Sequence, residues 1–442
     1  MNPATVVSQR AQLSTHFENR KPSVIRQAQI LFNQRADRDR VRCINLAIGN
    51  VSLPMHPALQ KRMRSLGEAG SPFANGVVMY SPSVGLPETR GAMLHVIKAA
   101  GLSTDGLEAL ITDGGSAAME LMVLGVAGPK SARPLVLVDP IYTNYADMCR
   151  RVSVPFVSVP RELRADGCFT RPDLEALDRL CEKEKPVALV VCPSDNPTGQ
   201  YLNRADLADI ARLCVRRNLW LVSDEAYRQL HYTGEPVSSV WALDEATVPG
   251  ITGRRISIES ASKLWNACGL RVGGIVTDSS EFHAKAVAEY TANLCTNVIG
   301  QWIFAALADE TEESLTAWYA QQRRYYVEMM RGLRDDLQRA VPGIIVSQPL
   351  AALYSVIDLV KVVAPSFDAG AFVRYCAEQG RIDLDGQAYT LLVAPMSGFY
   401  TATQTAAGRT QLRMAYVEPP KETALVPKLF AALLERYQAT LA

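Results

Sequence analysis

One short stretch, residues 260–274, holds the residue types that carbonyl chemistry needs. It reads Ser-Ala-Ser-Lys-Leu-Trp-Asn-Ala-Cys-Gly-Leu-Arg-Val-Gly-Gly, with Lys263 directly after two hydroxyl residues. A lysine amine forms a Schiff base with an aldehyde when burial or a neighbouring cation keeps part of it unprotonated. The guanidinium of Arg271 and the hydroxyl of Ser260 suit one phosphate. Taken alone, such a stretch is also typical of a solvated surface loop.

An aldehyde and a phosphate on one ligand suggest pyridoxal phosphate, so the rest of the chain must provide a place for its ring. Polar residues follow four apolar runs of strand type: Tyr142, Asn196, then Asp224 with Tyr227, then Lys263. In a parallel sheet, these strand ends form the ligand site.

Each of these residue types suits one part of the ring. The carboxylate of Asp224 would raise the pKa of the ring nitrogen and keep it protonated. Asn196 and Tyr227 can hold the phenolic oxygen, and Tyr142 can stack on the ring face.

Glycines mark two further places where a ligand could approach the backbone. Gly114, Gly115 and Ser116 lie where a strand pattern changes to a helix pattern, the geometry in which backbone N–H groups hold an anion. The stretch is not Gly-x-Gly-x-x-Gly, so a dinucleotide site is not supported. A strand over 44–49 should end at Gly49. This glycine either lets a ligand approach the backbone or forms a simple turn.

The pattern of apolar residues predicts an α/β fold with two domains. Strand runs occupy 135–139, 154–159, 187–192, 219–223 and 255–259, with helices such as 171–185 and 204–217 between them. Continuous apolar strands with helical crossovers predict a large domain with a mainly parallel, seven-stranded-type sheet flanked by helices.

The ends of the chain predict a smaller α+β domain. A long helix over 318–339 leads to further elements, with strands near 344–346, 353–357 and 411–416 and a helix over 426–437. We place the large domain at 56–315 and form the small domain from 1–55 and 316–442.

Composition excludes several classes of function. The 442 residues carry 46 Lys and Arg against 45 Asp and Glu, which does not favour binding to nucleic acid or to an anionic membrane. Charges interrupt the first thirty residues, and no apolar run reaches the length of a membrane span. The nine scattered cysteines fit a reducing compartment, and neither they nor the five histidines show metal-ligand spacing. We predict a cytoplasmic protein without a metal.

Together the motifs resemble those of the fold-type I pyridoxal-phosphate enzymes, most closely the class I/II aminotransferases. The resemblance covers about 44–416 and is carried by Asn-Pro-Thr-Gly from 196, Asp-x-x-Tyr from 224, Ser-x-Ser-Lys from 260 and Gly-x-Arg-x-Gly from 269. It implies that Lys263 holds the cofactor as a Schiff base and then moves the proton. It also implies a phosphate cup, made of Gly114, Gly115, Ser116, Ser260 and Arg271.

The resemblance further implies how the substrate is held. Arg413, in Gln-Leu-Arg-Met-Ala-Tyr, would clamp the substrate α-carboxylate with help from the backbone of Gly49. Tyr80 would reach the phosphate of a neighbouring subunit, so the active unit would be a homodimer with shared sites. The substrate side chain would meet 51–56, Tyr80, Tyr142 and 395–400.

Two features depart from the family pattern. Asp195 precedes Asn196 where a neutral residue is usual, and we expect its side chain to face solvent. No arginine can be assigned by pattern to a second substrate carboxylate. The basic pairs Arg254–Arg255 and Arg323–Arg324 should be solvated faces.

These residues allow three hypotheses for function. The first is an aminotransferase that moves an amino group between an amino acid and a 2-oxo acid by a ping-pong mechanism. The second is a β/γ-lyase or decarboxylating synthase, which would share every cofactor residue. The third is a cofactor-sensing regulator that binds DNA, but the first forty residues are short for a winged helix and the charge is balanced.

Overall fold

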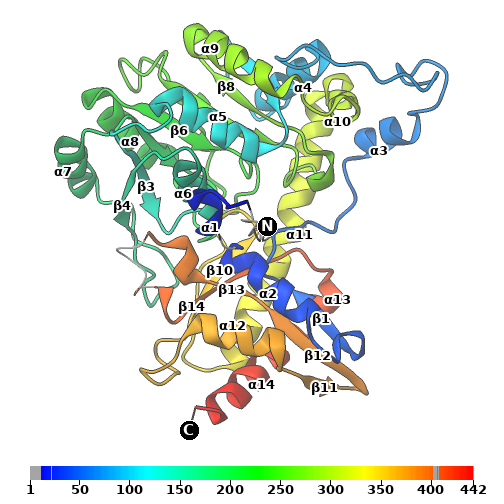
Figure 1. Cartoon of the computed structure of the whole chain (residues 1–442), viewed down its shortest axis with the longest axis vertical. Helices are drawn as coiled ribbons and strands as arrows, with labels where there is room; N and C mark the ends of the chain where they lie inside the picture. Colours follow the sequence, from blue (N-terminus) through cyan, green and yellow to red (C-terminus); the bar gives the residue numbers. More distant parts are fainter. Residues whose placement is uncertain (1–10, 21, 402–405, 407, 442) are drawn as a thin grey trace, which may run out of the picture.

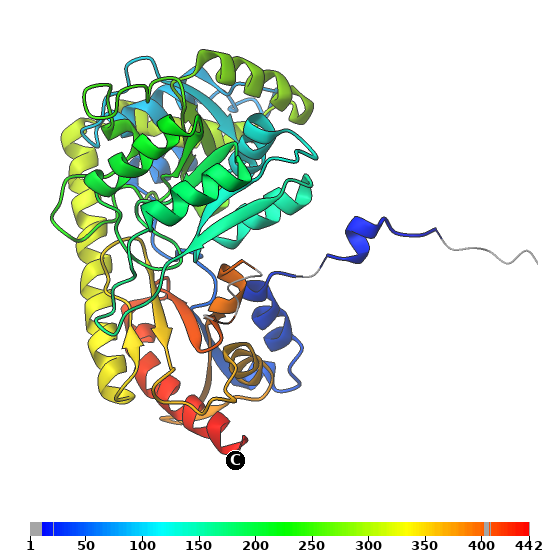
Figure 2. The ribbon, with the colours of Figure 1, turned by 90° about the vertical axis from the view of Figure 1, so that its left-hand side faces the viewer.

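The computed structural model describes residues 11–20, 22–401, 406 and 408–441. In Figure 1, a larger α/β part occupies the upper half, and a smaller part that combines both ends of the chain occupies the lower half. Helix α11 (Glu312–Ala340) runs through both parts, and Figure 2 shows it along one side of the molecule. The predicted division into two domains describes this arrangement, while the boundaries at 56 and 315 stay predictions.

The larger part is built on a seven-stranded sheet in the order β2-β8-β7-β6-β5-β3-β4. Its strands are β2 (Glu108–Thr112), β3 (Leu135–Asp139), β4 (Phe156–Pro160), β5 (Ala188–Val191), β6 (Trp220–Asp224), β7 (Arg255–Ser260) and β8 (Gly273–Thr277). All neighbours pair in parallel except those of β8, which is antiparallel to β2 and β7. The prediction of a mainly parallel sheet is confirmed.

Helices cover both faces of this sheet. They are α3 (Pro57–Arg64), α4 (Pro87–Lys98), α5 (Gly115–Ala127), α6 (Thr143–Arg151), α7 (Leu174–Glu184), α8 (Arg204–Arg216), α9 (Ser280–Tyr290) and α10 (Val298–Phe304). Successive strand side chains point to opposite faces, and Ile275 and Val276 of β8 accordingly lie in two separate apolar clusters. Because both faces are buried, the strands are mainly apolar.

The smaller part contains two short sheets, in the orders β1-β12-β11 and β13-β14-β10-β9. Its strands are β1 (Val41–Asn45), β9 (Ile345–Val346), β10 (Tyr354–Asp358), β11 (Ile382–Leu384), β12 (Gln387–Leu392), β13 (Ala394–Pro395) and β14 (Gln411–Ala415). Its helices are α2 (Val24–Asn33), α12 (Ala369–Glu378), α13 (Pro420–Thr423) and α14 (Val426–Ala439). A short helix, α1 (Thr15–Glu18), precedes them.

Strand β1 differs from the strand expected over 44–49. It pairs in parallel with β12, and the ladder ends where Asn45 lies opposite Leu392. The carbonyl of Leu46 then accepts a hydrogen bond from the N–H of Ala415, at the end of β14. The chain therefore passes from one sheet to the other at Leu46, and Gly49 lies beyond the strand.

Helix α11 also begins six residues earlier than the predicted start at Trp318. The hydroxyl of Thr311 accepts a hydrogen bond from the N–H of Ser314 and caps the helix. The resulting 29-residue helix is long enough to contribute to both parts of the molecule.

A buried group of three charges lies where β6 and β7 end. The guanidinium of Arg228 contacts Glu225 at 3.1 Å and also bonds Glu259, and all three side chains are buried. Hydroxyls of Ser223 and Ser257 donate to the two carboxylates at 2.8 and 2.6 Å. Such a group is stable only while every charge keeps its partners.

Replacing Arg228 by methionine should therefore lower the free energy of unfolding by about 3–5 kcal/mol, because two buried carboxylates lose their cation. Denaturant unfolding at neutral pH measures the change. The exposed pair Arg179–Glu175, 3.5 Å apart on one helix, provides the control. Arg179→Gln should alter stability by less than about 0.5 kcal/mol, and equal effects of the two substitutions would contradict this account.

Candidate active site

A cavity of about 860 Å³ lies where the carboxyl ends of β5, β6 and β7 meet the smaller part of the molecule. Most of the predicted site residues line it: Gly49, Gly115, Ser116, Tyr142, Asn196, Asp224, Tyr227, Ser260, Lys263, Arg271 and Arg413. Gly114 lies beside Arg271 at its edge. Tyr80 is 80% exposed and is not among the residues that line the cavity.

The amine of Lys263 points to the chain segment that follows β1. Its Nζ donates a hydrogen bond to the carbonyl of Gly49 at 2.5 Å. A Cβ at position 49 would lie 2.3 Å from the hydroxyl of Tyr354 and 3.4 Å from Lys263 Nζ. Only glycine therefore lets this backbone approach the lysine.

Asp224, at the end of β6, is a buried carboxylate without a cationic side chain in contact among the described residues. Its oxygens accept hydrogen bonds from the hydroxyl of Tyr145 at 3.0 Å and the N–H of Ala226 at 3.2 Å. Burial raises the pKa of Asp224 to about 6. A cationic ring nitrogen in the cavity would supply the missing counter-charge.

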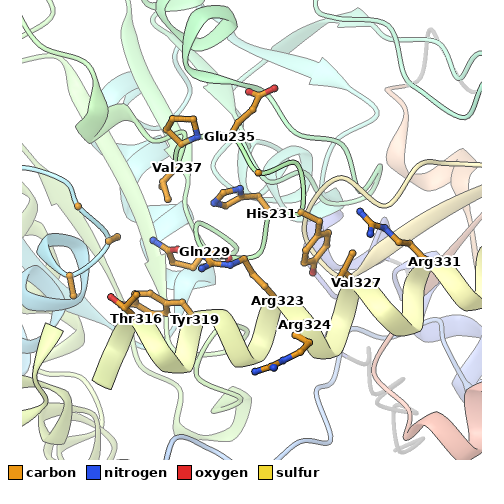
Figure 3. Close-up of a pocket in the computed structure, with 16 residues that line it drawn as sticks. Gln229, His231, Glu235, Val237, Thr316, Tyr319, Arg323, Arg324, Val327 and Arg331 are labelled. Carbon is orange, nitrogen blue, oxygen red and sulfur yellow. Dashed lines mark hydrogen bonds between the residues drawn. The ribbon is translucent and has the colours of Figure 1, made fainter. Parts of the chain in front are cut away.

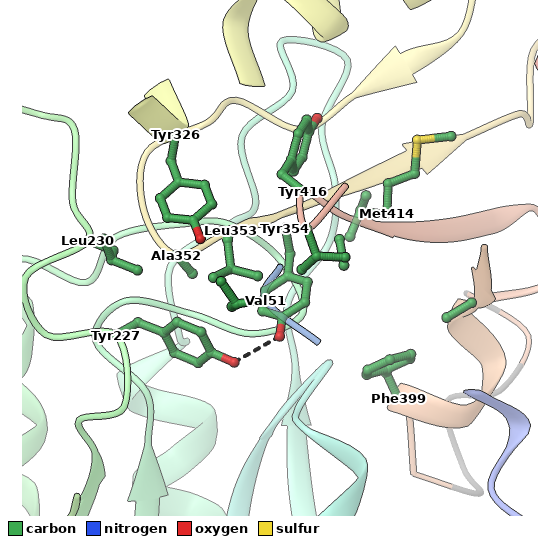
Figure 4. Packing of buried hydrophobic residues seen from close by; sticks show 14 of the residues in the cluster. Val51, Tyr227, Leu230, Tyr326, Ala352, Leu353, Tyr354, Phe399, Met414 and Tyr416 are labelled. Atoms are coloured by element: carbon green, nitrogen blue, oxygen red, sulfur yellow. Dashed lines mark hydrogen bonds between the residues drawn. The ribbon is translucent and has the colours of Figure 1, made fainter. Parts of the chain in front are cut away.

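Tyr227 reaches the cavity from the turn after β6, and Figure 4 shows its hydroxyl pointing to that of Tyr354. The two oxygens are 2.8 Å apart, and the rings meet edge to face. Tyr354 is the first residue of β10, so this bond joins the two parts of the molecule. It lies within a continuous apolar core that includes Leu230, Leu353 and Met414.

Arg413, in β14, is a buried cation without an acidic partner among the described residues. Its guanidinium donates to Asn196 Oδ1 at 3.1 Å and to the carbonyl of Ala47 at 2.5 Å, while Nε has no partner there. The rings of Tyr354 and Phe399 lie 4.5 and 4.8 Å from it. A planar, buried and unpaired guanidinium is suited to a carboxylate ligand.

The predicted anion cup is formed by the start of α5, the end of β7 and the turn before β8. Gly114 has φ 75° and precedes the first helical residue, Gly115. A Cβ at position 114 would lie 2.4 Å from Arg271 Nη2, so glycine lets the guanidinium reach the helix N-terminus. Partial positive charge at that terminus and the cation of Arg271 both favour an anion.

Asp195 corrects one sequence prediction. We expected this side chain to face solvent, but it is only 4% exposed. Its carboxylate pairs with Arg161 at 2.8 Å and bonds the hydroxyl of Thr198. The extra negative charge is therefore neutralised on the side of the turn away from the cavity, since Asp195 does not line it.

The basic pairs also differ from the solvated faces that we predicted. Arg255 is only partly exposed and pairs with Asp278 at 2.8 Å. Arg323 is partly buried and donates to Gln229 Oε1 at 2.8 Å, while Arg324 is exposed. In each pair one arginine has a structural partner that a local sequence pattern does not reveal.

Sequence patterns did not identify three residues of the cavity and its walls. Tyr145 supports Asp224, Tyr354 supports Tyr227, and Arg26 lines the cavity from α2. The only local signal is the three-residue spacing of Tyr142 and Tyr145 on one helix. Arg26 is exposed and makes no ion pair among the described residues.

The described residues contain neither a cluster of metal ligands nor a membrane-spanning helix. In those residues, no group of three or more His, Cys, Asp and Glu side chains is placed to hold a metal ion. No described helix combines the length and apolar character needed to cross a membrane.

Comparison with known proteins identifies the family. The family model described as aminotransferase class I and II matches residues 41–410. This chain belongs to that family. The enzyme is an aminotransferase, as the resemblance of its motifs predicted, and the family generally depends on pyridoxal phosphate.

Several curated relatives are transaminases. The chain is 28% identical over 289 residues to an aspartate/prephenate aminotransferase of Thermus thermophilus. This match covers 65% of this chain and 70% of the relative. It is 30% identical over 236 residues to a probable N-succinyldiaminopimelate aminotransferase of Mycobacterium tuberculosis, covering 53% and 55%. It is also 28% identical over 291 residues to a 2-aminoadipate transaminase of Thermus thermophilus, covering 65% and 67%.

Solved structures support the fold. An aspartate aminotransferase from Thermus thermophilus with maleate matches with a TM-score of 0.75 and 23% identity, covering 96% of this chain and all of that one. The N-succinyldiaminopimelate aminotransferase of Mycobacterium tuberculosis matches with a TM-score of 0.77, 23% identity and the same coverage.

The buried carboxylate of Asp224 makes a prediction for the cofactor-free enzyme. Its pKa is about 6 in the folded chain against 3.8 in the unfolded chain, so folding favours the protonated form and stability falls as pH rises from 3.8 through 6. Asp224→Asn should stabilise the cofactor-free enzyme at pH 8 by up to about 3 kcal/mol. The gain should nearly vanish near pH 4, and denaturant unfolding at both pH values tests it. If the gain were equal at the two pH values, the carboxylate of Asp224 would not have a raised pKa in the folded chain.

Proposed function

We propose that this chain binds pyridoxal phosphate in the cavity and transfers an amino group between an amino acid and a 2-oxo acid. The observation that carries this proposal is the pair of buried, unpaired charges, Asp224 and Arg413, that line the same cavity as Lys263. One suits a protonated ring nitrogen, and the other suits an α-carboxylate.

When bound, pyridoxal phosphate supplies an aldehyde that takes up the amino group and a protonated ring that withdraws electrons from the substrate α-carbon. Lys263 holds the cofactor and then moves a proton at that carbon. Asp224 keeps the ring nitrogen protonated, while Asn196 and Tyr227 bind the phenolic oxygen. Tyr142, which lines the cavity, would stack on the ring face.

The anion cup and the clamp complete the proposed roles. Gly114, Gly115, Ser116, Ser260 and Arg271 hold the phosphate through N–H groups, hydroxyls and a guanidinium. Arg413 holds the α-carboxylate, with the backbone of Gly49 beside the reacting amine. Lyases and decarboxylating synthases would use the same cofactor residues, but the family and the relatives named above favour transamination.

We propose an amino acid with a second acidic group as the donor. The relatives named above act, by their names, on aspartate, prephenate, N-succinyldiaminopimelate or 2-aminoadipate, all of which carry more than one carboxylate. In this chain, Arg26 lines the cavity with its guanidinium unpaired among the described residues. Its charge acts on Tyr142, which lines the same cavity.

We also propose a homodimer in the cytoplasm. Residues Val77, Val78, Met79 and Tyr80 form a run of exposed side chains, and Leu294 is exposed nearby, where its carbonyl accepts a hydrogen bond from Ser83. Such an apolar patch is typical of a protein interface. A second copy that covers it would bring Tyr80 to the neighbouring cavity and complete the phosphate site.

The phosphate cup predicts a difference between two neighbouring glycines. Gly114→Ala should weaken pyridoxal phosphate binding by about tenfold or more, because the new Cβ displaces Arg271 and the φ of 75° disfavours alanine. Gly115→Ala is the matched control, since its Cβ would meet only ordinary contacts at 3.6 Å. Cofactor absorbance during titration of the cofactor-free enzyme measures both. If the two variants bound pyridoxal phosphate with equal affinity, Arg271 would not be part of the phosphate cup.

The test of the function is the half-reaction of the purified, cofactor-loaded enzyme with single amino acids. Acidic amino acids should convert the bound cofactor to pyridoxamine phosphate and release a 2-oxo acid, while Lys263→Ala should show neither change. If no amino acid reacts, the proposed transamination is wrong. If only neutral amino acids react, the acidic donor is wrong.

Two arginine variants in the same assay separate the two carboxylates. Arg413→Lys should raise the half-saturating concentration of every amino acid by about tenfold or more, because a lysine lacks the bidentate fork. Arg26→Gln should raise it by about tenfold for aspartate and 2-aminoadipate and leave alanine unchanged. If Arg26→Gln raised the half-saturating concentration of alanine by the same factor, Arg26 would have no role in recognising the substrate side chain.

A further inference from the structure

A second cavity, of about 610 Å³, lies on another side of the segment that carries Tyr227. It is enclosed by α11, by residues 229–237 and by the turn at 99–101, and we call it the α11 groove. Figure 3 shows its side chains between the helix and the 229–237 segment. The residues that line it are distinct from those of the active-site cavity.

One face of α11 supplies the charge of this groove. Arg323, Val327 and Arg331 recur every fourth residue and therefore share a helix face, which is turned to the 229–237 segment in Figure 3. Arg324, the next residue along the helix, also lines the groove. Among the described residues, none of Arg323, Arg324 and Arg331 has an acidic side chain within ion-pair distance, so the groove presents three uncompensated cations.

His231 is the second feature that indicates a ligand. Its side chain lines the groove and is only 6% exposed, and neither ring nitrogen has a hydrogen-bond partner among the described residues. The ring stacks on Tyr201 at 5.0 Å, which fixes its orientation. Burial and the charge of Arg323 lower the pKa of His231 to about 4, so the imidazole is neutral near pH 7. A buried N–H without a partner opposes folding, and a ligand oxygen that accepted its hydrogen bond would remove that cost.

Acidic groups do not neutralise the groove. Glu235 is the one acidic residue among the described residues that line it. In Figure 3 its carboxylate points away from α11, and its charge acts instead on Tyr201 and Asp206. The remaining wall near the arginines is apolar or aromatic, with Val237 and Tyr319.

We propose that the α11 groove binds a small organic anion that carries two or more acidic groups. Arg323 and Arg331 lie about 12 Å apart along the helix axis, so their long side chains can reach separate acidic groups of one ligand. The volume is within the range of small-molecule sites. Arg323 donates a hydrogen bond to Gln229 Oε1 at 2.8 Å. A bound acidic group would share the guanidinium with that side chain.

The experiment is a calorimetric titration of the cofactor-loaded enzyme with citrate, which has three carboxylates and neither an amino nor an oxo group to react. The wild-type chain should bind one citrate per chain saturably. Arg331→Gln and Arg323→Gln should each weaken that binding by about tenfold or more. Arg339→Gln is the matched control, because it removes the same charge from an exposed position of the same helix that does not line the groove.

Three outcomes would overturn the proposal. The first is no saturable binding by the wild-type chain. The second is an equal loss in Arg339→Gln, which would indicate attraction by net charge alone. The third is a loss in Arg413→Lys without a loss in Arg331→Gln, which would place citrate in the active-site cavity. Arg331 is exposed, so its replacement leaves the fold intact and keeps the test decisive.

Discussion

The active-site cavity depends on charges that are buried without a counter-ion inside the chain. Arg413 and Asp224 are both removed from water, and neither contacts a side chain of opposite charge among the described residues. Burial of a lone charge opposes folding, so each position lowers the stability of the empty enzyme. Ligand charges that occupy the cavity offset this cost. Binding and stability are therefore linked through these two groups.

The two charges come from different parts of the molecule. Asp224 ends a strand of the large sheet, whereas Arg413 lies in β14 of the smaller part. Hydrogen bonds between Arg413 and Asn196, and between Lys263 and Gly49, cross the same boundary. A substrate held at Arg413 and a cofactor held at Lys263 would thus contact both parts of the molecule. The site is complete only when the smaller part packs beside the large sheet.

Strand periodicity made part of the fold and of the site predictable from sequence. Continuous apolar strands imply a parallel sheet, and the residues after those strands must then meet at one edge, as Asn196, Asp224 and Lys263 do. Residues that depend on long-range packing could not be found this way. Tyr354 reaches Tyr227 from 127 positions away, and Asp195 is neutralised by an arginine just beyond the end of β4. Such partners are fixed by how the elements pack, which local pattern does not encode.

The segment after β6 connects the active-site cavity to the α11 groove. Asp224 and Tyr227 line the cavity, Gln229 and His231 line the groove, and Arg228 between them is held by two buried glutamates. Coupling between two sites needs an element with two arrangements that both ligands bias. The buried ion pairs of Arg228 with Glu225 and Glu259 hold the segment after β6 in place and oppose such a shift. A ligand that binds Arg323 would instead contact α11, the helix shared by both parts of the molecule.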